Sequence, residues 1–200
     1  MGRDQSVTFR RTTCPHCRGK LEQGQRIHAE CIAPWADAQA EKAKRTAQKQ
    51  ARMAAKVERA ETRRRKEAIK TIPVLIAEAD KAFAAYIRER DRQAWYPCIS
   101  SGRPLEWSGN AVDAGHYRSR GAASHLRYHE DNCHAQSKHE NRYLAGNALE
   151  YRARLIERIG LARVEALEAD NRAHKWTADE LRGIRDRYRA KLKELKGRKC

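Results

Sequence analysis

The stretch from residue 36 to residue 70 constrains the fold most strongly, because it contains no glycine or proline and consists largely of alanine, lysine, arginine, glutamate and glutamine. These residues are strong helix formers, so the stretch predicts one helix of up to about ten turns. Large apolar residues are too few to form a sustained heptad seam, which argues against a coiled coil. We therefore expect a solvated spacer helix.

Positive charge is in excess along this helix and over the whole chain. The helical stretch carries twelve Lys or Arg against five Asp or Glu, and all 200 residues sum to a formal net charge of +17. Such an imbalance costs self-repulsion unless a polyanion offsets it, so nucleic acid is the expected partner. Phosphate contact is compatible with a spacer helix, and the candidate DNA contacts in it are Arg63, Arg64, Arg65 and Lys66.

The first 31 residues hold three of the six cysteines, in a pattern typical of structural zinc sites. Cys14 and Cys17 form a C-x2-C knuckle, and His28 and Cys31 follow as H-x2-C. Three thiolates and one imidazole complete a tetrahedral Zn2+ site, and a module this small would need the metal to fold. The alternative is a disordered tail with free thiols. A disulfide framework fits the uneven spacing poorly.

The chain as a whole reads as soluble and intracellular. It has no run of about 18 apolar residues and no apolar signal region behind the basic N-terminus. Aromatic residues are 6% and charged residues 34%, so much of the chain should be helix surface. We expect three parts: a zinc-binding module at residues 1–35, a basic helical linker at 36–72 and a larger domain at 73–200.

Apolar residues at helical spacing predict the core of this larger domain. The first stripe consists of Leu75, Ala79, Phe83, Tyr86 and Ile87. A second stripe surrounds a break at Gly160 and consists of Leu155, Ile159, Val164 and Leu167. Thr177 and Glu180 form a capping box that opens the final helix.

Residues 113–147 collect five histidines, three asparagines and one cysteine in 35 positions. Helix propensity does not require them, and a core would reject most of them because buried imidazoles and amides need partners. The pattern predicts a strand within 110–119, a second extended piece at 125–132 and a helix over 135–144. A hairpin followed by a helix can gather side chains from three elements around one metal ion.

The side chains of this segment suit phosphodiester hydrolysis, which needs a base, a divalent ion and positive groups. His116 is the candidate base, because an imidazole titrates near neutral pH. Asp113 is the nearest carboxylate and offers oxygen atoms to Mg2+. Arg118 and Arg120 flank the base and could bind a phosphate through their guanidinium groups, although a solvated strand arginine is the competing interpretation.

Residues 98–160 resemble the NinG/Rap family of lambdoid phages, most specifically in "AGHYRS" and "NRYLAGN". The stretches "RERDRQAWYPCIS" and "HKWTADEL" and the N-terminal cysteine cluster extend the resemblance over nearly the whole chain. It implies an α+β, mostly helical fold in which helices flank a small ββα-metal (HNH-like) centre. It also implies a phage or prophage endonuclease of the host cytoplasm that cuts branched DNA, such as four-way junctions and D-loops.

The resemblance implies roles for further residues of the centre. Asn141 resembles the family's closing Asn or His, a ligand of the catalytic Mg2+ or Mn2+, and Asn132 resembles the asparagine that orients the loop and the base. His134 matches a family histidine and is a tentative ligand. Asp113 is another, although Gly115 stands where many such sites carry a carboxylate. Two cuts at one junction favour a homodimer.

The sequence departs from the family pattern at a second structural zinc site, which members commonly build from two C-x2-C knuckles. Here the first knuckle retains Cys98 but has Ser101, and the second has Ser137 and Glu140. Because serine hydroxyls are poor Zn2+ ligands at neutral pH, we predict that this second zinc is absent. A hydrogen-bonded cluster of the two serines and the glutamate is the expected substitute.

Two other functions stay open at this point. A non-catalytic binder of branched or duplex DNA would use the zinc module and the basic helices, and its central histidines would only stabilise the fold. RNA binding through the zinc module would predict a preference for single strands, for which the sequence shows no run of aromatic residues. Substitution His116→Ala separates the endonuclease from the non-catalytic binder: it should abolish cutting and leave affinity nearly unchanged in the first, and change nothing measurable in the second.

Overall fold

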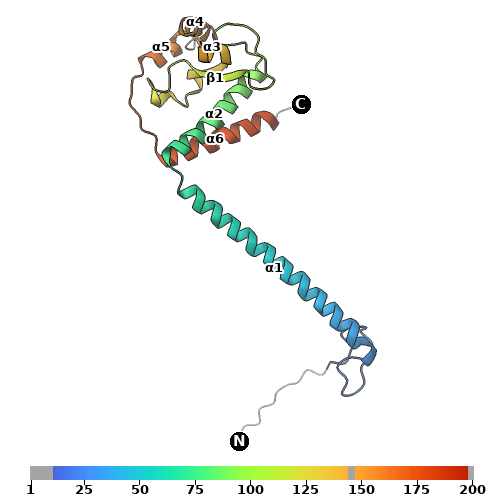
Figure 1. The fold of residues 1–200 in the computed structure, drawn as a ribbon. Helices are drawn as coiled ribbons and strands as arrows, with labels where there is room; N and C mark the ends of the chain where they lie inside the picture. Colours follow the sequence, from blue (N-terminus) through green and yellow to red (C-terminus); the bar gives the residue numbers. More distant parts are fainter. Residues whose placement is uncertain (1–10, 144–146, 198–200) are drawn as a thin grey trace. The chain divides into compact units, whose positions relative to one another are not determined.

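The computed structural model describes residues 11–143 and 147–197 of the chain. The chain divides into two compact units, residues 1–69 and residues 70–200. Helices predominate and one small sheet lies in the second unit, so the fold is mostly helical α+β (Figure 1). None of the helices in the described ranges combines the length and apolar character that a membrane span requires. The three-part division at residues 35 and 72 stays a prediction.

The first unit consists of a cysteine-rich loop followed by one long helix. A turn of 3-10 helix, η1 (Ala29–Cys31), leads into helix α1 (Ile32–Ala68). The helix predicted from composition is thereby confirmed, and none of its side chains is buried. Exposed ion pairs such as Arg65 with Glu61, 3.8 Å apart, add little stability, so helix propensity is the main support of α1.

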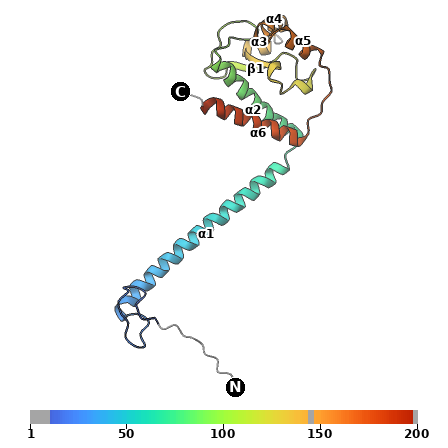
Figure 2. The same cartoon turned by 180° about the vertical axis from the view of Figure 1, so that it is seen from behind.

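Two helices form the main core of the second unit: α2 (Ile72–Gln93) and α6 (Ala178–Gly197) lie side by side (Figures 1 and 2). Arg185 pairs with Glu78 near the start of both helices, so they run in the same direction. The predicted stripe is confirmed, because all five of its members are buried. They pack in one cluster with Leu181, Ile184 and Tyr188 of α6.

The C-terminal helices follow the sequence signals closely. Helix α4 (Ala148–Ile159) and helix α5 (Leu161–Ala169) are separated by Gly160, whose φ of +87° favours glycine. Before α6, the Thr177 amide donates to Glu180 Oε2 (2.8 Å) and the Glu180 amide donates to Thr177 Oγ1 (3.3 Å). The predicted capping box is therefore confirmed.

The sheet has two antiparallel strands, β1 (Val112–His116) and β2 (Cys133–Ser137), and helix α3 (Lys138–Tyr143) follows β2 directly. His116 lies opposite Cys133, and Gly115 lies opposite the next residue of β2. Because side chains alternate across a strand, these two pairs lie on opposite faces of the sheet. The His116 face meets Phe83 of α2, and the Tyr151 hydroxyl of α4 donates to the Gly115 carbonyl (2.9 Å) on the other side. Helices thus cover both faces.

The prediction of a strand at 125–132 is wrong, and so is the prediction that the following helix begins at residue 135. Residues 124–126 and 130–132 form two 3-10 turns, η2 (Ser124–Leu126) and η3 (Glu130–Asn132). The strand comes later, at β2, where four of five residues are buried. The sequence of β2, CHAQS, does alternate apolar and polar residues, but the run is only five residues long and its polar members His134 and Gln136 are buried as well. Such a short run does not separate a strand from a helix by periodicity.

Candidate functional site

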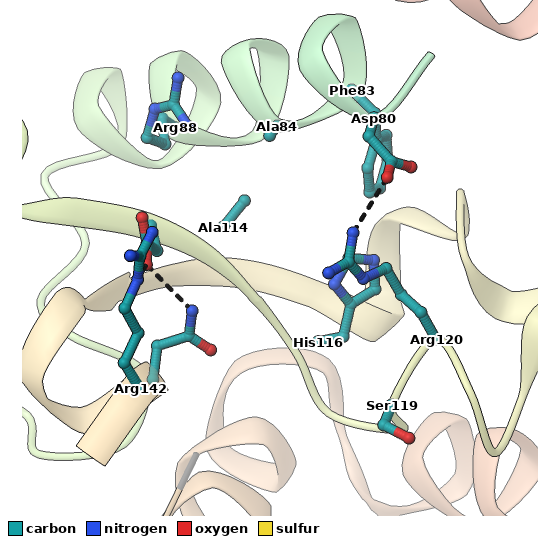
Figure 3. A pocket seen from close by; sticks show the side chains of 11 residues that line it. Asp80, Phe83, Ala84, Arg88, Ala114, His116, Ser119, Arg120 and Arg142 are labelled. Carbon is teal, nitrogen blue, oxygen red and sulfur yellow. Dashed lines mark hydrogen bonds and ion pairs between the residues drawn. The ribbon is translucent and has the colours of Figure 1, made fainter. Parts of the chain in front are cut away.

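A pocket of about 630 Å3 opens between α2, β1 and α3 (Figure 3). Its lining residues include four that the sequence singled out, namely Asp113, His116, Arg120 and Asn141. The remaining lining residues are Asp80, Phe83, Ala84, Arg88, Ala114, Ser119 and Arg142. The hairpin and the helix after it thus bring histidine, carboxylate and amide groups into one pocket, as expected of such a unit.

His116 ends strand β1, and its ring is held by the loop that follows. Its Nε2 atom lies 2.9 Å from the Arg127 carbonyl. A carbonyl only accepts, so Nε2 carries the hydrogen and Nδ1 keeps the lone pair; Nδ1 lies 3.9 Å from Cys133 Sγ. Burial lowers the pKa of His116 and outweighs the hydrogen bond to Arg127, which raises it. The imidazole is therefore neutral near pH 7 and able to accept a proton.

Asp113 and Asn141 form the oxygen-rich part of the pocket. Asn141 Nδ2 donates to Asp113 Oδ2 (3.1 Å), and Arg142 Nε donates to the same oxygen (3.0 Å). Burial opposes ionisation of Asp113, but these two hydrogen bonds hold the pKa of its carboxyl group below the usual value. A stable carboxylate beside an amide oxygen is a pair of ligands that hard cations such as Mg2+ accept.

Positive charge surrounds these groups. Figure 3 shows Arg88 and Arg142 at one end of the pocket and Arg120 beside His116 at the other. Asp80 accepts from Arg120 Nη1 (2.9 Å), so both pocket carboxylates are paired. Arg88 has no ion-pair partner within the described part of the chain. The pocket therefore retains one uncompensated cation, which suits an anionic ligand.

Asn132 does not line the pocket but organises the loop beside it. Its side chain is fully buried. Its Oδ1 atom accepts from the Arg118 amide (2.8 Å), and Nδ2 donates to the carbonyls of Arg118 (3.0 Å) and Leu126 (3.1 Å). These bonds connect the chain after β1 to the turn before β2. Such a position suits an orienting role and excludes direct contact with a ligand in the pocket.

The predicted role of Arg118 in DNA binding does not fit its surroundings. Its guanidinium donates to the carbonyls of Leu167 (2.8 Å) and Asp170, and to Asn171 Oδ1 (2.7 Å). These carbonyls lie at the end of α5, where a helix leaves carbonyl groups without internal partners. Arg118 therefore closes the end of a helix, and its Nη1 atom and one donor of Nη2 are occupied there.

His134 does not fit the predicted role of catalytic metal ligand either. It is buried on β2 and is absent from the pocket lining. Arg90 Nη2 lies 3.0 Å from its Nδ1, and its Nε2 lies 3.2 Å from the Asp131 carbonyl. Both ring nitrogens are thus occupied by protein groups, which leaves no lone pair for an ion.

The structure adds pocket residues that the sequence alone did not indicate, above all Asp80 and Arg88. With Ala84 they are spaced four residues apart and therefore line one stripe of α2. The four-residue spacing in the sequence is enough to place these three residues on one face of a helix. Only the packing of α2 against the sheet shows that this stripe faces His116 and not solvent.

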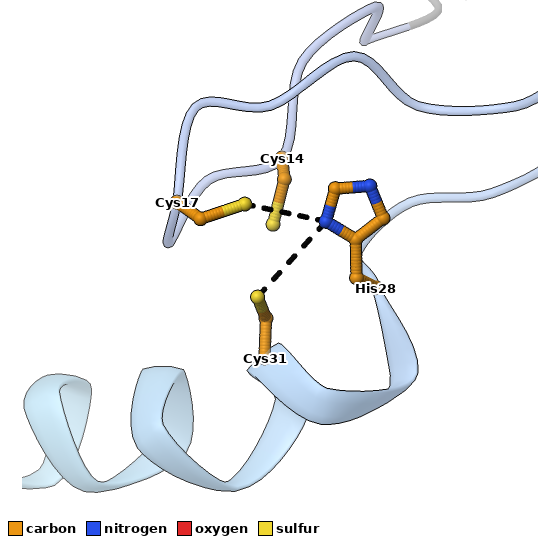
Figure 4. Close-up of side chains that lie close together, drawn as sticks. All are labelled: Cys14, Cys17, His28 and Cys31. Carbon is orange, nitrogen blue, oxygen red and sulfur yellow. Dashed lines mark hydrogen bonds between the residues drawn. The ribbon is translucent and has the colours of Figure 1, made fainter.

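A second candidate site, in the first unit, consists of Cys14, Cys17, His28 and Cys31 (Figure 4). One ligand atom from each lies within 4.8 Å of all the others. His28 Nδ1 is 3.2 Å from Cys17 Sγ and 4.0 Å from Cys31 Sγ, while its Nε2 is 3.1 Å from the Lys20 carbonyl. That carbonyl directs the Nδ1 lone pair toward the thiols, as outer partners of zinc-bound histidines do. The cluster could bind zinc.

Local geometry favours ionisation of one thiol, Cys14, while burial and hydrogen bonds with Cys17 and Cys14 raise the pKa of Cys31 to about 12. Burial opposes ionisation of Cys14, yet hydrogen bonds from the amides of Cys17, His28 and His16 lower its pKa to about 6. A Cβ at Gly19 would lie 3.3 Å from Cys17 Sγ, so glycine allows the turn to approach the sulfur closely. A thiolate is the form that binds zinc.

The turn at Cys98 has hydrogen bonds where the family's second zinc would lie. Burial opposes ionisation of the Cys98 thiol, but hydrogen bonds from Ser101 and from the amides of Ser137 and Ser100 lower its pKa. The Ser137 amide lies 3.3 Å from Cys98 Sγ, and the Glu140 amide donates to Ser137 Oγ (3.3 Å). The two serines of the predicted cluster thus meet at the remaining cysteine, whereas Glu140 takes part only through its backbone amide, and its carboxylate accepts from Asn147 Nδ2 (3.3 Å). The absence of a second zinc stays a prediction.

Comparison with known proteins agrees with the sequence signals. A family model described as "Bacteriophage Lambda NinG protein" matches residues 7–198. Protein NinG of Salmonella phage P22 is 44% identical over 134 residues, which cover 66% of this chain and 63% of that protein. Protein NinG of Escherichia phage lambda is 42% identical, over 66% and 62% respectively. The alignments thus span less than two thirds of the length of these relatives, and no solved structure matches. This chain belongs to the NinG family of phage proteins.

Proposed function

We propose that this protein is a metal-dependent DNA endonuclease of the HNH-like type that acts on branched recombination intermediates in the host cytoplasm. The observation that carries the proposal is the meeting of His116 from β1 and Asn141 from α3 in one pocket with Asp113. The order of strand, loop, strand and helix around that pocket supports an HNH-like, ββα-metal centre. Selectivity for branched DNA rests on the family resemblance.

In this mechanism His116 is the general base. Its Nε2–H bond to the Arg127 carbonyl orients the ring, and Nδ1 would take the proton from the attacking water, because its one protein neighbour among the described residues, Cys133 Sγ, is a weak donor at a long 3.9 Å. The lowered pKa keeps the base unprotonated at neutral pH. Asn132 holds the loop that carries the Arg118 backbone and the Leu126 carbonyl, and so maintains the position of the base indirectly.

The oxygen atoms of Asp113 and Asn141 would hold a catalytic Mg2+ or Mn2+. Both are hard ligands, and the hydrogen bond between their side chains places them side by side. Two protein ligands are enough for Mg2+, which usually retains several waters and binds substrate phosphate. When bound, the ion would stabilise negative charge on the phosphorane and on the leaving oxygen.

The pocket arginines would bind the DNA backbone. Arg88 has a free charge, and Arg120 and Arg142 can share their guanidinium groups between a carboxylate and a phosphate oxygen. In the first unit the exposed residues of α1, including Arg63, Arg64, Arg65 and Lys66, would add contacts independent of base sequence. A homodimer would supply the two cuts that resolve a junction.

Cleavage of a synthetic four-way junction, beside a linear duplex of matching sequence, tests the proposal. Wild-type protein should cut the junction with Mg2+ or Mn2+ and not with EDTA. His116→Ala should lose cutting by about 100-fold or more, the usual contribution of a general base, while binding the junction with nearly unchanged affinity. His129→Ala removes an exposed histidine that is absent from the pocket lining, and it should cut normally.

One observation favours the rival function, a non-catalytic DNA-binding protein: α1 is strongly basic and none of its side chains is buried. Under the rival function, wild-type protein retards the junction in a gel but cuts it with neither ion. That result would refute the nuclease proposal. Unchanged melting temperature of His116→Ala is needed to separate loss of catalysis from loss of the fold.

A further inference from the structure

Helix α2 ends in a Schellman motif whose left-handed position is occupied by a tryptophan. The Tyr96 amide donates to the Asp91 carbonyl (3.0 Å), and the Trp95 amide donates to the Arg92 carbonyl (3.2 Å). These two bonds define the motif. Trp95 has a φ of +55°, a conformation that glycine, or sometimes asparagine, usually supplies because a Cβ is unfavourable there.

Folding offers no reason for a large aromatic residue at this point. The Trp95 side chain is 88% exposed, so its indole gains little from burial. Within the described part of the chain it stacks on no other ring. Left-handed backbone in a bulky residue is strained, and such strain is often associated with a functional site. The tryptophan thus costs local stability and presents a flat apolar surface to solvent.

The residues that follow Trp95 and two arginines of helix α4 line a basic hollow. A shallow pocket of about 270 Å3 is lined by Tyr96, Arg154 and Arg158, among others, and Glu157 is the one carboxylate among its described lining residues. The Arg158 guanidinium lies 4.3 Å from the centre of the Tyr96 ring. Exposed aromatic rings combined with arginine are the chemistry that recognises a nucleobase and its neighbouring phosphate.

We propose that Trp95 is a stacking platform for an unpaired base of bound DNA, separate from the pocket that contains His116. The inference rests on the DNA binding in the proposed function and not on cleavage. Arg88 of that pocket lies seven residues before Trp95, a rise of about 10 Å along a helix, or about three base steps of B-DNA. A base displaced near a branch point can therefore reach the indole while its backbone occupies the pocket.

Substitution Trp95→Gly tests this site, because glycine relieves the left-handed strain and should leave the melting temperature unchanged or higher. Fluorescence anisotropy compares a fully paired duplex with the same duplex carrying a short single-stranded flap. Trp95→Gly should weaken binding to the flapped DNA roughly tenfold, the scale of one base stack, and leave duplex affinity unchanged. Trp95→Phe should retain most of the affinity. The matched control is Leu149→Ala, which removes an apolar side chain that is 85% exposed and should change neither affinity.

Three other outcomes overturn the inference in distinguishable ways, and a fourth rejects only the nuclease. Equal affinity of wild type and Trp95→Gly for flapped DNA would reject the platform and leave DNA binding intact. Failure of wild type to bind either DNA would reject both the platform and the proposed function. Loss of a dimer in sedimentation of Trp95→Gly, with DNA affinity unchanged, would assign the indole to contact between two copies of the chain. Absence of cutting together with the flap-specific loss would reject only the nuclease.

Discussion

Two cysteine-containing turns of this protein, the first at Cys14 and the second at Cys98, are stabilised in different ways. Around Cys14, three thiols and an imidazole converge, and among the described residues the local core contains only Cys14, Leu21 and Cys31, with Ile27 packed against it. Two of these core residues, Cys14 and Cys31, are themselves candidate metal ligands. So little apolar surface cannot offset the conformational entropy that the loop loses on folding. We therefore expect the binding free energy of a metal ion to stabilise the folded loop.

The turn at Cys98 is supported by its surroundings. Ile99 next to it is completely buried in a cluster with Leu155 and Val164, and the Ile99 amide donates to the Ala135 carbonyl (3.1 Å) along the free edge of β2. The Cys98 thiol accepts hydrogen bonds from Ser100, Ser101 and Ser137. If zinc binds at the first turn and not at the second, as we expect, the core and backbone pairing around each turn account for the difference.

The largest expected effect is loss of the first turn on removal of zinc. Native mass spectrometry should find one zinc ion per chain, and Cys14→Ser or a strong chelator should remove it. Structural zinc supplies about 10–16 kcal/mol of apparent binding free energy in small modules, so amide signals of residues 11–31 should collapse in NMR spectra. Persistence of dispersed signals without metal would show that the first turn, like the second, supports itself.

Substitution Asp91→Asn should destabilise the second unit by about 3–5 kcal/mol. Asp91 is fully buried and accepts from the Ala135 amide (2.6 Å) and from Arg90 Nε (2.7 Å), with Arg158 Nη1 at 3.7 Å. Loss of the negative charge leaves two arginines close together with no counter-charge. Urea denaturation measures the effect, and Asp179→Asn, whose side chain is 96% exposed, should shift stability by less than about 0.5 kcal/mol. Similar values for both variants would mean that buried charge does not support β2.

Acid should weaken the second unit through its buried histidines. Burial, with the charge of Arg90, holds the pKa of His134 well below its usual value, and burial lowers that of His116. The unfolded chain therefore binds more protons below about pH 6.5, so stability present at higher pH is lost as pH falls. Each histidine adds a slope of at most about 1.4 kcal/mol per pH unit. Urea denaturation between about pH 7 and pH 5 should show a smaller slope for His134→Gln; an identical slope would count against this origin.

The smallest expected effect is that of Cys98→Ser. A hydroxyl can accept the hydrogen bond from the Ser137 amide that the thiol now accepts, so the loss of stability should stay near or below about 1 kcal/mol. Zinc content should remain one ion per chain, in contrast to Cys14→Ser. Loss of a metal ion from Cys98→Ser would show that the second turn also depends on metal and would remove the contrast.

Local signals in the sequence were accurate wherever neighbours along the chain decide the structure. The helix without glycine or proline, the stripe that includes Phe83, the break at Gly160 and the capping box at Thr177 are all confirmed. The cysteine and histidine cluster belongs with them, because short spacings allow few other arrangements. Prediction failed at β2, whose five residues are too few for periodicity to separate a strand from a helix, and whose polar residues His134 and Gln136 are buried by packing on the second face.

The sequence by itself determined the helices, the ligand cluster of the first unit and the residues from which a catalytic pocket can be built. Only the tertiary structure decided which of them share that pocket: His116, Asp113 and Asn141 do, while Asn132 supports a loop and His134 faces Arg90. The physical reason is that a helix presents only one stripe to its neighbour, and that Asp113 and His116, three residues apart on β1, both line the pocket only because α2 and α3 pack around the strand. A role in a site assembled from three elements therefore depends on register and packing, which no local pattern records.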